Sequence, residues 1–284
     1  MPEERRQNFN RNHDLHTRSM ERVVRAMADR LRFAMSNEEL AEIACFSPCH
    51  FNRLFRRMTG IPPVQFHYAL RVARAKELLI DTDTSVTEIC FDVGYNSLGT
   101  FVSRFHELVG VSPNGFRRIA RQIEGMCLAD FPLARVEGSP PSFSAGDLAG
   151  TIERDCGSAV IFVGLFRQPI PVGMPHACTL LRDGSRYTLP VPPDGTWHVQ
   201  SVAVPLTANG SQLLTLNDLS RGRGTAITVN EGHWIGDSDI RLSLPSSLDP
   251  PILAALPIKV INWGAPEVSG QRNKNRFPQE QVAI

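Results

Sequence analysis

Residues 48–58 combine a regular apolar pattern with side chains that can read DNA bases. The apolar residues recur at i, i+3, i+4 and i+7 and face inward if the segment is a helix: Phe51, Leu54, Phe55 and Met58. In the major groove, arginine pairs bidentately with guanine and asparagine with adenine. The alternative to base contacts is that the polar side of this helix is a charged face that contacts only water. We expect base contacts from the polar side, which holds Cys49, Asn52, Arg53 and Arg56.

A second segment, residues 98–109, repeats the apolar spacing with weaker polar chemistry. The inward set is Leu98, Phe101, Phe105 and Leu108. The residues left for base contacts are Asn96, Gly99, Thr100 and Ser103. Arg104 lies to the side, where it reaches a phosphate more easily than a base. We expect the first segment to supply most base readout, and the second to position the protein through the DNA backbone and DNA shape.

Candidate phosphate contacts flank both segments. They are Ser47, His50, Arg57, Ser97, Arg104, Arg117 and Arg118. For Arg117 and Arg118, a merely solubilising role is an equal alternative. Residues 1–122 hold 18 basic against 14 acidic residues, and 17 of the basic ones are arginine. The planar fork of arginine matches both phosphate and guanine, so this bias favours nucleic acid as the partner.

The two segments belong to an internal repeat, which predicts two helix-turn-helix units. Residues 36–66 and 85–116 share a cap serine followed by glutamate, a turn aromatic, two phenylalanines, a glycine, a proline and a final phenylalanine. The offset is 49 residues up to the turn aromatics and 50 afterwards. Two such helices can occupy successive major grooves, roughly 34 Å apart. One protomer can therefore cover an asymmetric site, so a homodimer is allowed but not required.

Periodicity and caps predict a multidomain chain, α then β. Residues 1–17 are polar and aperiodic, which predicts a disordered arm. An all-α double helix-turn-helix domain is expected over 18–122, with helices at 17–33, 37–44, 48–58, 64–80, 85–93, 98–109 and 113–121. A linker over 123–145 precedes an all-β sandwich over 146–245, with strands at 148–152, 159–166, 177–181, 187–189, 197–204, 226–229 and 240–244. Residues 246–284 are expected to be largely irregular.

Residues 36–118 resemble the DNA-binding domain of AraC/XylS-type transcriptional regulators. The resemblance rests on Ser-Pro-Cys-His-Phe-Asn-Arg-Leu-Phe-Arg-Arg-Met-Thr-Gly in the first copy, Val-Ser-Pro-Asn-Gly-Phe-Arg in the second, and the linking Arg-Val-Ala-Arg-Ala-Lys-Glu-Leu-Leu. It implies a bacterial-type activator or repressor that reads bases from positions 49, 52 and 53. An activator would also contact RNA polymerase. Many family members carry arginine where Ser103 stands, and the sensing domain usually comes first, whereas here the order is reversed.

The second half is similar to transthyretin-like, carboxypeptidase-regulatory-type β-sandwich domains. Thr-Leu-Leu-Arg-Asp-Gly-Ser-Arg-Tyr-Thr-Leu and Pro-Pro-Asp-Gly-Thr-Trp-His-Val carry this resemblance. Such a domain can bind a small-molecule effector, pair protomers or contact another protein. Tyr187, Trp197 and Trp234 can line an apolar effector pocket, but aromatic residues at strand spacing more often pack in the sandwich core. Without a ligand, the chain would be a DNA-targeted interaction or adaptor protein.

Three other features suggest chemistry. Pro48-Cys49-His50 is similar to the methyl-acceptor motif of DNA alkylation-repair proteins, but the Arg-Val that usually follows is replaced by Phe51-Asn52. Cys45 and Cys49 can form a redox pair, although we expect Cys45 to be buried. A metal could be held by His176, Cys178, His198 and His233, but their spacing does not require one. Without a phosphate loop, paired carboxylates or a nucleophile elbow, we expect no enzyme, cofactor or metal.

The composition is that of a globular protein in a reducing compartment. Apolar residues make up 42% and charged residues 21% of the chain, and the six cysteines form no CxxC pair. No apolar run approaches the roughly 18 to 20 residues of a membrane helix, and the start lacks the apolar stretch of a signal peptide. We expect a cytoplasmic protein with no membrane contact. We also expect residues 1–124 alone to keep specific DNA binding.

Overall fold

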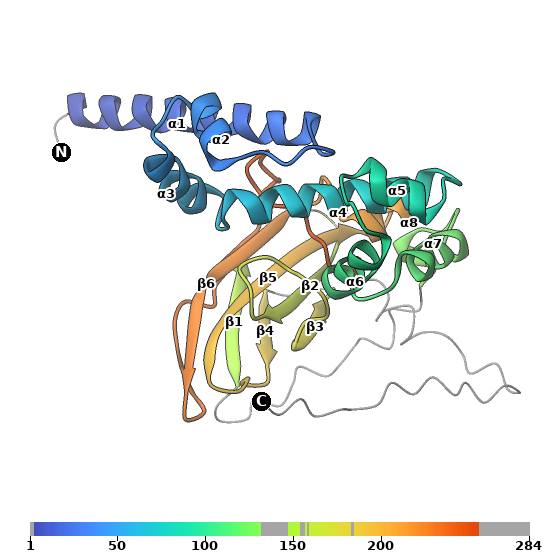
Figure 1. The fold of residues 1–284 in the computed structure, drawn as a ribbon. Coiled ribbons are helices and arrows are strands. Elements are labelled where there is room, and N and C mark those ends of the chain that lie inside the picture. The colour runs from blue at the N-terminus through green and yellow to red at the C-terminus, as the bar shows by residue number, and fades with distance from the viewer. Residues whose placement is uncertain (1–2, 132–146, 154–156, 158, 183–184, 256–284) are drawn as a thin grey trace, which may run out of the picture.

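Helices form the first part of the chain and strands most of the rest (Figure 1). The structure is a computed structural model and describes residues 3–131, 147–153, 157, 159–182 and 185–255. The helices of the first part are α1 (Glu3–Asp29), α2 (Asn37–Ala44), α3 (Pro48–Thr59), α4 (Pro63–Asp81), α5 (Val86–Asp92), α6 (Leu98–Val109) and α7 (Pro113–Gln122). Helices α2 and α6 have the bounds expected from sequence, and α3, α4, α5 and α7 differ from the expected bounds by single residues at their ends.

Equivalent caps begin and end the helices of the two helix-turn-helix units. At the starts of α2 and α5, a serine and a glutamate three residues later form capping boxes, Ser36 with Glu39 and Ser85 with Glu88. Each box satisfies backbone N–H groups that a helix start leaves without partners. Helices α3 and α6 both end at a glycine with positive φ, Gly60 at +86° and Gly110 at +94°.

The repeat also appears in the aromatic packing of the two units. The rings of Phe51 and Phe55 lie 5.5 Å apart at 57°, and those of Phe101 and Phe105 lie 5.7 Å apart at the same angle. In each unit the second phenylalanine meets a later one, Phe66 or Phe116, nearly edge to face. This geometry suits the quadrupoles of aromatic rings, and the two units have the same arrangement of phenylalanine side chains.

The strands form two sheets that share a hydrophobic core. They are β1 (Leu148–Glu153), β2 (Ala159–Phe166), β3 (Ala177–Leu181), β4 (Arg186–Leu189), β5 (Gly195–Pro205), β6 (Arg221–Asn230), β7 (His233–Ile235) and β8 (Ile240–Arg241). One sheet has the order β4-β1-β8 and the other β3-β2-β5-β6-β7. Side chains such as Leu148, Ile161 and Val199 fill the space between them.

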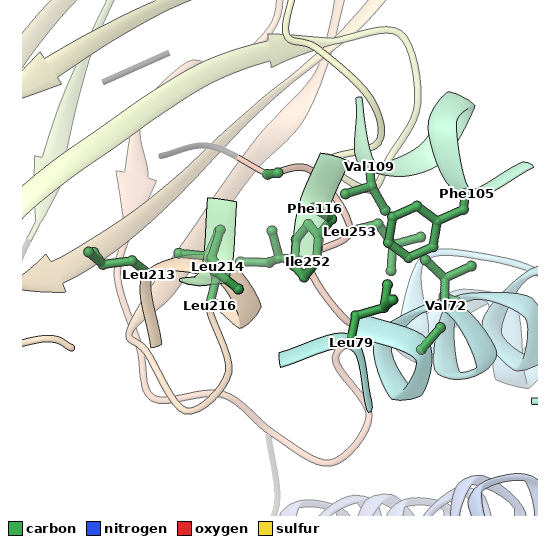
Figure 2. Packing of buried hydrophobic residues seen from close by; sticks show 14 of the residues in the cluster. Val72, Leu79, Phe105, Val109, Phe116, Leu213, Leu214, Leu216, Ile252 and Leu253 are labelled. Atoms are coloured by element: carbon green, nitrogen blue, oxygen red, sulfur yellow. The ribbon is translucent and has the colours of Figure 1, made fainter. Parts of the chain in front are cut away.

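A second core joins the five-stranded sheet to the helices. Figure 2 shows Val72 and Leu79 of α4 and Phe116 of α7 gathered with Leu214 and Leu253 from the second half of the chain. Val160 and Phe162 of β2 belong to the same cluster. Burying one such side chain contributes about 1.5–3 kcal/mol. The second helix-turn-helix unit therefore completes its core with residues far along the chain.

Lys76 anchors the C-terminal segment to α4. It is 1% exposed, and its Nζ donates to the carbonyl oxygens of Ile252 at 3.1 Å and Leu253 at 3.5 Å. The ammonium also lies 5.8 Å from the centre of the Phe116 ring. Residues 246–255 are irregular, as expected, but Leu248 and Ile252 to Ala255 are buried. The segment is thus part of the core rather than a loose extension.

The structure differs from the expected domain limits at two places. Helix α1 begins at Glu3, where a disordered arm over 1–17 was expected. Its later part buries Met20 and Met27, and lengthening an anchored helix costs far less than nucleating one. The first residues of the expected linker, which was predicted over 123–145, are attached to the strand-rich part. The Leu128 N–H donates to the Ala208 oxygen at 2.9 Å. Residues 132–145 and 256–284 lie outside the described residues.

Two short elements were not expected from sequence. Helix α8 (Gly210–Thr215) begins at an Asn209–Gln212 capping box and buries Leu213 and Leu214 against the helical part. Strand β7 closes a hairpin with β6 through pairs such as Val229 with Trp234. Both are too short for periodicity to indicate them. Within the part of the chain that the structure describes, no helix is long and apolar enough to cross a membrane.

The buried ammonium of Lys76 predicts a pH-dependent stability. Burial lowers the pKa of Lys76 from 10.5 to about 7. Between these values the unfolded chain holds the proton and the folded protein does not, so the free energy of unfolding should rise with pH by about 1.4 kcal/mol per unit. Urea unfolding at pH 7, 8 and 9 would measure this slope.

The Lys76→Met variant should lose that contribution to the slope. The matched control is Arg74→Met, on the half-exposed side of the same helix, which should keep it. Equal slopes for the wild type and Lys76→Met would contradict the assignment.

The shared core predicts that residues 1–124 are unstable alone, contrary to the sequence-based expectation. The fragment would expose Val109, Phe116 and Leu79, which residues such as Leu214 and Leu253 cover in the full chain. We expect unfolding at a lower urea concentration than for residues 1–284, followed by circular dichroism at 222 nm. A fragment as stable as the full chain would show that the two parts fold independently.

Candidate nucleic-acid interface

Helix α3 presents a basic face to solvent. Its apolar side chains, including Phe51 and Phe55, are buried against the first unit. The exposed residues of its other side are Cys49, Arg53, Arg56 and Arg57. One guanidinium nitrogen of Arg53, Nη2, lies 3.3 Å from Nδ1 of His50. Arg53 and Arg56, which were predicted to contact bases, are thus exposed on this face.

Asn52 makes protein contacts in place of the expected free orientation. Its Nδ2 donates to Oδ1 of Asn37 at 2.7 Å and to the Pro48 oxygen at 3.2 Å. The side chain is half-buried, since it stands between the exposed and buried sides of α3, next to the start of α2. The structure therefore gives Asn52 a role in joining the two helices of the first unit.

The start of α3 is framed by an aromatic cluster. The His50 ring lies 5.0 Å from that of Phe46 and 6.3 Å from that of His16, which is on α1. His50, expected at a phosphate, is therefore half-buried and also supports Arg53. Ser47 is exposed at the N-cap of α3, and its side chain makes no capping hydrogen bond.

Helix α6 exposes small polar residues. The predicted base-reading residues Asn96, Gly99, Thr100 and Ser103 are all exposed. Ser97, expected at a phosphate, caps the helix by accepting from the Thr100 N–H at 3.4 Å. Leu98, expected to face inward, is 39% exposed because it is the first residue of the helix, at the edge of the core.

The three arginines expected at phosphates near α6 differ in their surroundings. Arg104 is exposed and pairs with Glu107 at 2.9 Å on the same helix. Arg117 is half-buried, and its guanidinium donates to the carbonyl oxygens of Leu79 and Thr84. It therefore binds the connection between α4 and α5 rather than facing outward, which corrects its expected role. Arg118 is exposed.

Two arginines fix the helix-turn-helix units relative to each other. Arg71 of α4 is 7% exposed and donates to the Gly94 oxygen in the second unit and the Phe33 oxygen beside the first, both at 3.0 Å. Burial lowers its pKa, and the nearby Tyr68 partly offsets this effect. Arg32 forms an ion pair with Asp92 across the same junction. The relative position of the two units therefore depends on the buried Arg71 and on an exposed ion pair.

The strand-rich part is hydrogen-bonded to the ends of the two exposed helices. Nη1 of Arg223 donates to the Thr59 oxygen at 3.2 Å, at the end of α3. The Gly173 N–H donates to the Leu108 oxygen at 2.7 Å, near the end of α6. Arg53 and Ser103, in the middle of these helices, stay exposed. The described chain thus leaves both polar faces open.

The aromatic residues considered for an effector pocket lie in the core shared by the two sheets, which is the packing that their strand spacing favoured. Tyr187 and Trp197 are each 2% exposed, and Trp234 packs against the same cluster. The Tyr187 hydroxyl donates to the Ser238 oxygen at 2.5 Å, and burial raises its pKa. Alternation along β4 and β5 turns these rings toward the opposite sheet, so they cannot serve an open pocket.

The other chemical hypotheses were methyl transfer at Cys49, a redox pair of Cys45 and Cys49, and a metal site. Cys45, expected to be buried, is exposed because it ends α2 with φ of 60°. Cys49 is a free, exposed thiol on α3. Across the residues that the structure describes, no group of three histidine, cysteine or acidic side chains is placed to hold a metal ion.

Comparison with known proteins agrees with this geometry. Residues 40–119 match the family model described as "Helix-turn-helix domain". The chain is 33% identical over 87 residues to the bifunctional transcriptional activator/DNA repair enzyme AdaA of Bacillus subtilis. This alignment covers 31% of the present chain and 41% of AdaA. It is 32% identical over 99 residues to the MmsAB operon regulatory protein of Pseudomonas aeruginosa, covering 35% and 32%.

Among solved structures, the DNA-binding domain of AdpA, the global transcriptional factor, in complex with a target DNA aligns at 32% identity with a TM-score of 0.35. The alignment covers 36% of this chain and 93% of that chain. Residues 40–119 are an AraC-type helix-turn-helix domain. The matched part of the chain spans between 30% and 41% of the length of AdaA, the MmsAB regulator and the melibiose operon regulatory protein of Escherichia coli.

The exposed guanidinium of Arg53 predicts a loss of base discrimination when it is removed. Arg53→Ala should weaken binding to a selected duplex by about 1–3 kcal/mol and relax preference at one position. Arg104→Ala, the matched control on α6, should weaken binding to all duplexes alike, because its site faces the DNA backbone. Competition binding against single-base variants would measure both. Equal relaxation by the two substitutions would overturn the assignment.

Proposed function

We propose that this chain is a sequence-specific transcriptional regulator that inserts α3 and α6 into successive major grooves of double-stranded DNA. The observation that carries the proposal is the open polar face on both helices, within a domain of the AraC helix-turn-helix type. In helix-turn-helix proteins, the second helix of each unit enters the major groove and contacts base edges.

The two helices divide the work in this proposal. Helix α3 reads bases through Arg53 and Arg56, with Cys49 beside them and Arg57 on a phosphate. Helix α6 presents Thr100 and Ser103, whose short side chains let the backbone approach the DNA closely. Arg104 and Arg118 then bind phosphates and hold the register. The sequence read by the first unit is accordingly longer than that read by the second.

The strand-rich part is proposed to be a β-sandwich that modulates this activity. Two sheets with a common core support the sandwich assignment. Attachment to the ends of α3 and α6 supports a modulating role through a ligand or a protein partner. An activator of this design would also contact RNA polymerase. Because one chain carries both reading helices, DNA binding does not require a homodimer.

The proposed function is non-enzymatic. In this proposal Cys49 is a base-facing residue, not a methyl acceptor. The two residues after His50 support this view, because Phe51 is buried in the core and Asn52 is bonded to Asn37. The similar protein AdaA is a bifunctional transcriptional activator and DNA repair enzyme, and we propose only the regulatory activity for this chain.

Selection from a random duplex library, followed by footprinting on genomic fragments, tests the proposal. We expect an enriched site with two elements separated by one helical turn, about 10–10.5 base pairs. The element contacted by α3 should be the more strictly defined. Failure to enrich any sequence, or a single element with no second footprint, would contradict the double-groove arrangement.

A further inference from the structure

A cavity of about 320 Å³ lies on the helix-facing side of the five-stranded sheet. Alternate residues of β2 face opposite ways: Ile161 and Leu165 lie in the core between the sheets, while Phe162 and Phe166 line the cavity. The other walls come from the loop over 169–175 and the C-terminal segment over 249–255. Cavities of about this size hold small molecules in other proteins.

The cavity combines an apolar wall with a cluster of arginines. Phe162, Ile170 and Val202 supply apolar surface. The charged residues of the lining are Arg221, Arg223, Arg241 and Asp249. The Asp249 carboxylate already accepts from the Ser246 N–H at 2.8 Å. Arg241 is paired with Glu153 at 3.8 Å, so the cationic donors left for a ligand are those of Arg221 and Arg223, which suit an anion better than a cation.

Arg221 is held in place with an unused donor. Its backbone pairs with Ser243 by two hydrogen bonds of 2.9 Å, and its Nη1 donates to the Pro250 oxygen at 3.0 Å. Its Nε is buried and has no acceptor among the described residues. A buried donor without a partner costs about 1–3 kcal/mol, so the guanidinium of Arg221 is not fully satisfied by the described protein atoms.

The cavity walls are attached to both reading helices. Arg223, in the lining, donates to the Thr59 oxygen at the end of α3. Gly173 and Ala255, also in the lining, donate through their N–H groups to Leu108 at 2.7 Å and Val109 at 3.0 Å, at the end of α6. A ligand that accepts a hydrogen bond from Arg223 competes with the Thr59 oxygen for the same guanidinium. Occupancy of the cavity can therefore alter how α3 is held relative to α6.

We propose that this cavity binds a small, mainly apolar molecule with a carboxylate or similar anionic group, and that the bound molecule changes the affinity for DNA. The second part rests on the proposed function. The anionic group meets Arg221 and Arg223, and the apolar body lies against Phe162 and Val202. The site is distinct from the aromatic cluster of Tyr187 and Trp197, which is closed within the other core.

The ligand half is tested by calorimetric titration of the full chain, without DNA, with 4-phenylbutyrate and octanoate. We expect saturable binding, and much weaker binding of the uncharged analogue 4-phenylbutanol. Arg221→Met should weaken carboxylate binding roughly 10- to 100-fold, the usual effect of losing a charged hydrogen bond. The matched control is Arg186→Met, at an exposed position of β4 outside the cavity lining, which should bind as the wild type does.

A second variant keeps the test decisive if Arg221→Met fails to fold. Val202→Phe fills the cavity without removing a charge and should abolish binding of both carboxylates, with folding checked by circular dichroism. The cavity assignment is overturned if neither carboxylate binds saturably. It is also overturned if folded Val202→Phe binds them as the wild type does.

The coupling half uses the duplex obtained by selection. Saturating 4-phenylbutyrate should change the affinity for that duplex by about 5- to 150-fold, and the duplex should change the carboxylate affinity by the same factor. Unchanged DNA affinity with a filled cavity would overturn the coupling. A chain that binds the carboxylates but selects no duplex would contradict the proposed function and still support the cavity as a ligand site.

Discussion

Two buried basic side chains on α4, Arg71 and Lys76, are the constraint on which the rest of the structure depends. A buried guanidinium or ammonium is costly unless hydrogen-bond acceptors replace the lost water. Arg71 meets this need with carbonyls beside the two helix-turn-helix units, and Lys76 meets it with carbonyls of the C-terminal segment. These acceptors are available only when the units and the segment are docked together. The linking helix thereby favours one arrangement of three parts of the chain.

This arrangement connects the proposed DNA-contacting surface to a ligand-sized cavity. The exposed polar faces are on the outer sides of α3 and α6, and the ends of the same helices receive hydrogen bonds from the cavity walls. Packed interfaces shift between discrete arrangements rather than deforming continuously, so contacts at a helix end can reorient the whole helix. The distance between the two reading helices is the quantity that such a shift would alter.

Local patterns in the sequence predicted most helices and strands and the exposed side of α3. They did not predict the contacts between segments that are distant along the chain. Apolar spacing and capping boxes predicted α2 and α6 to the residue. Asn52 and Arg117 were misjudged because their partners, Asn37 and Leu79, depend on tertiary packing. The shared core and the position of Trp197 also depend on which sheet face meets which element, and periodicity within one segment carries no such information.

Strand β2 has a consequence for how the molecule tolerates change. All eight of its residues are buried, with β3 on one side and β5 on the other. One side of the strand supports the small sheet and the other supports the helices, so a polar replacement disturbs one core or the other according to the face that it occupies. We accordingly expect its amide protons to exchange with deuterium mainly through global unfolding.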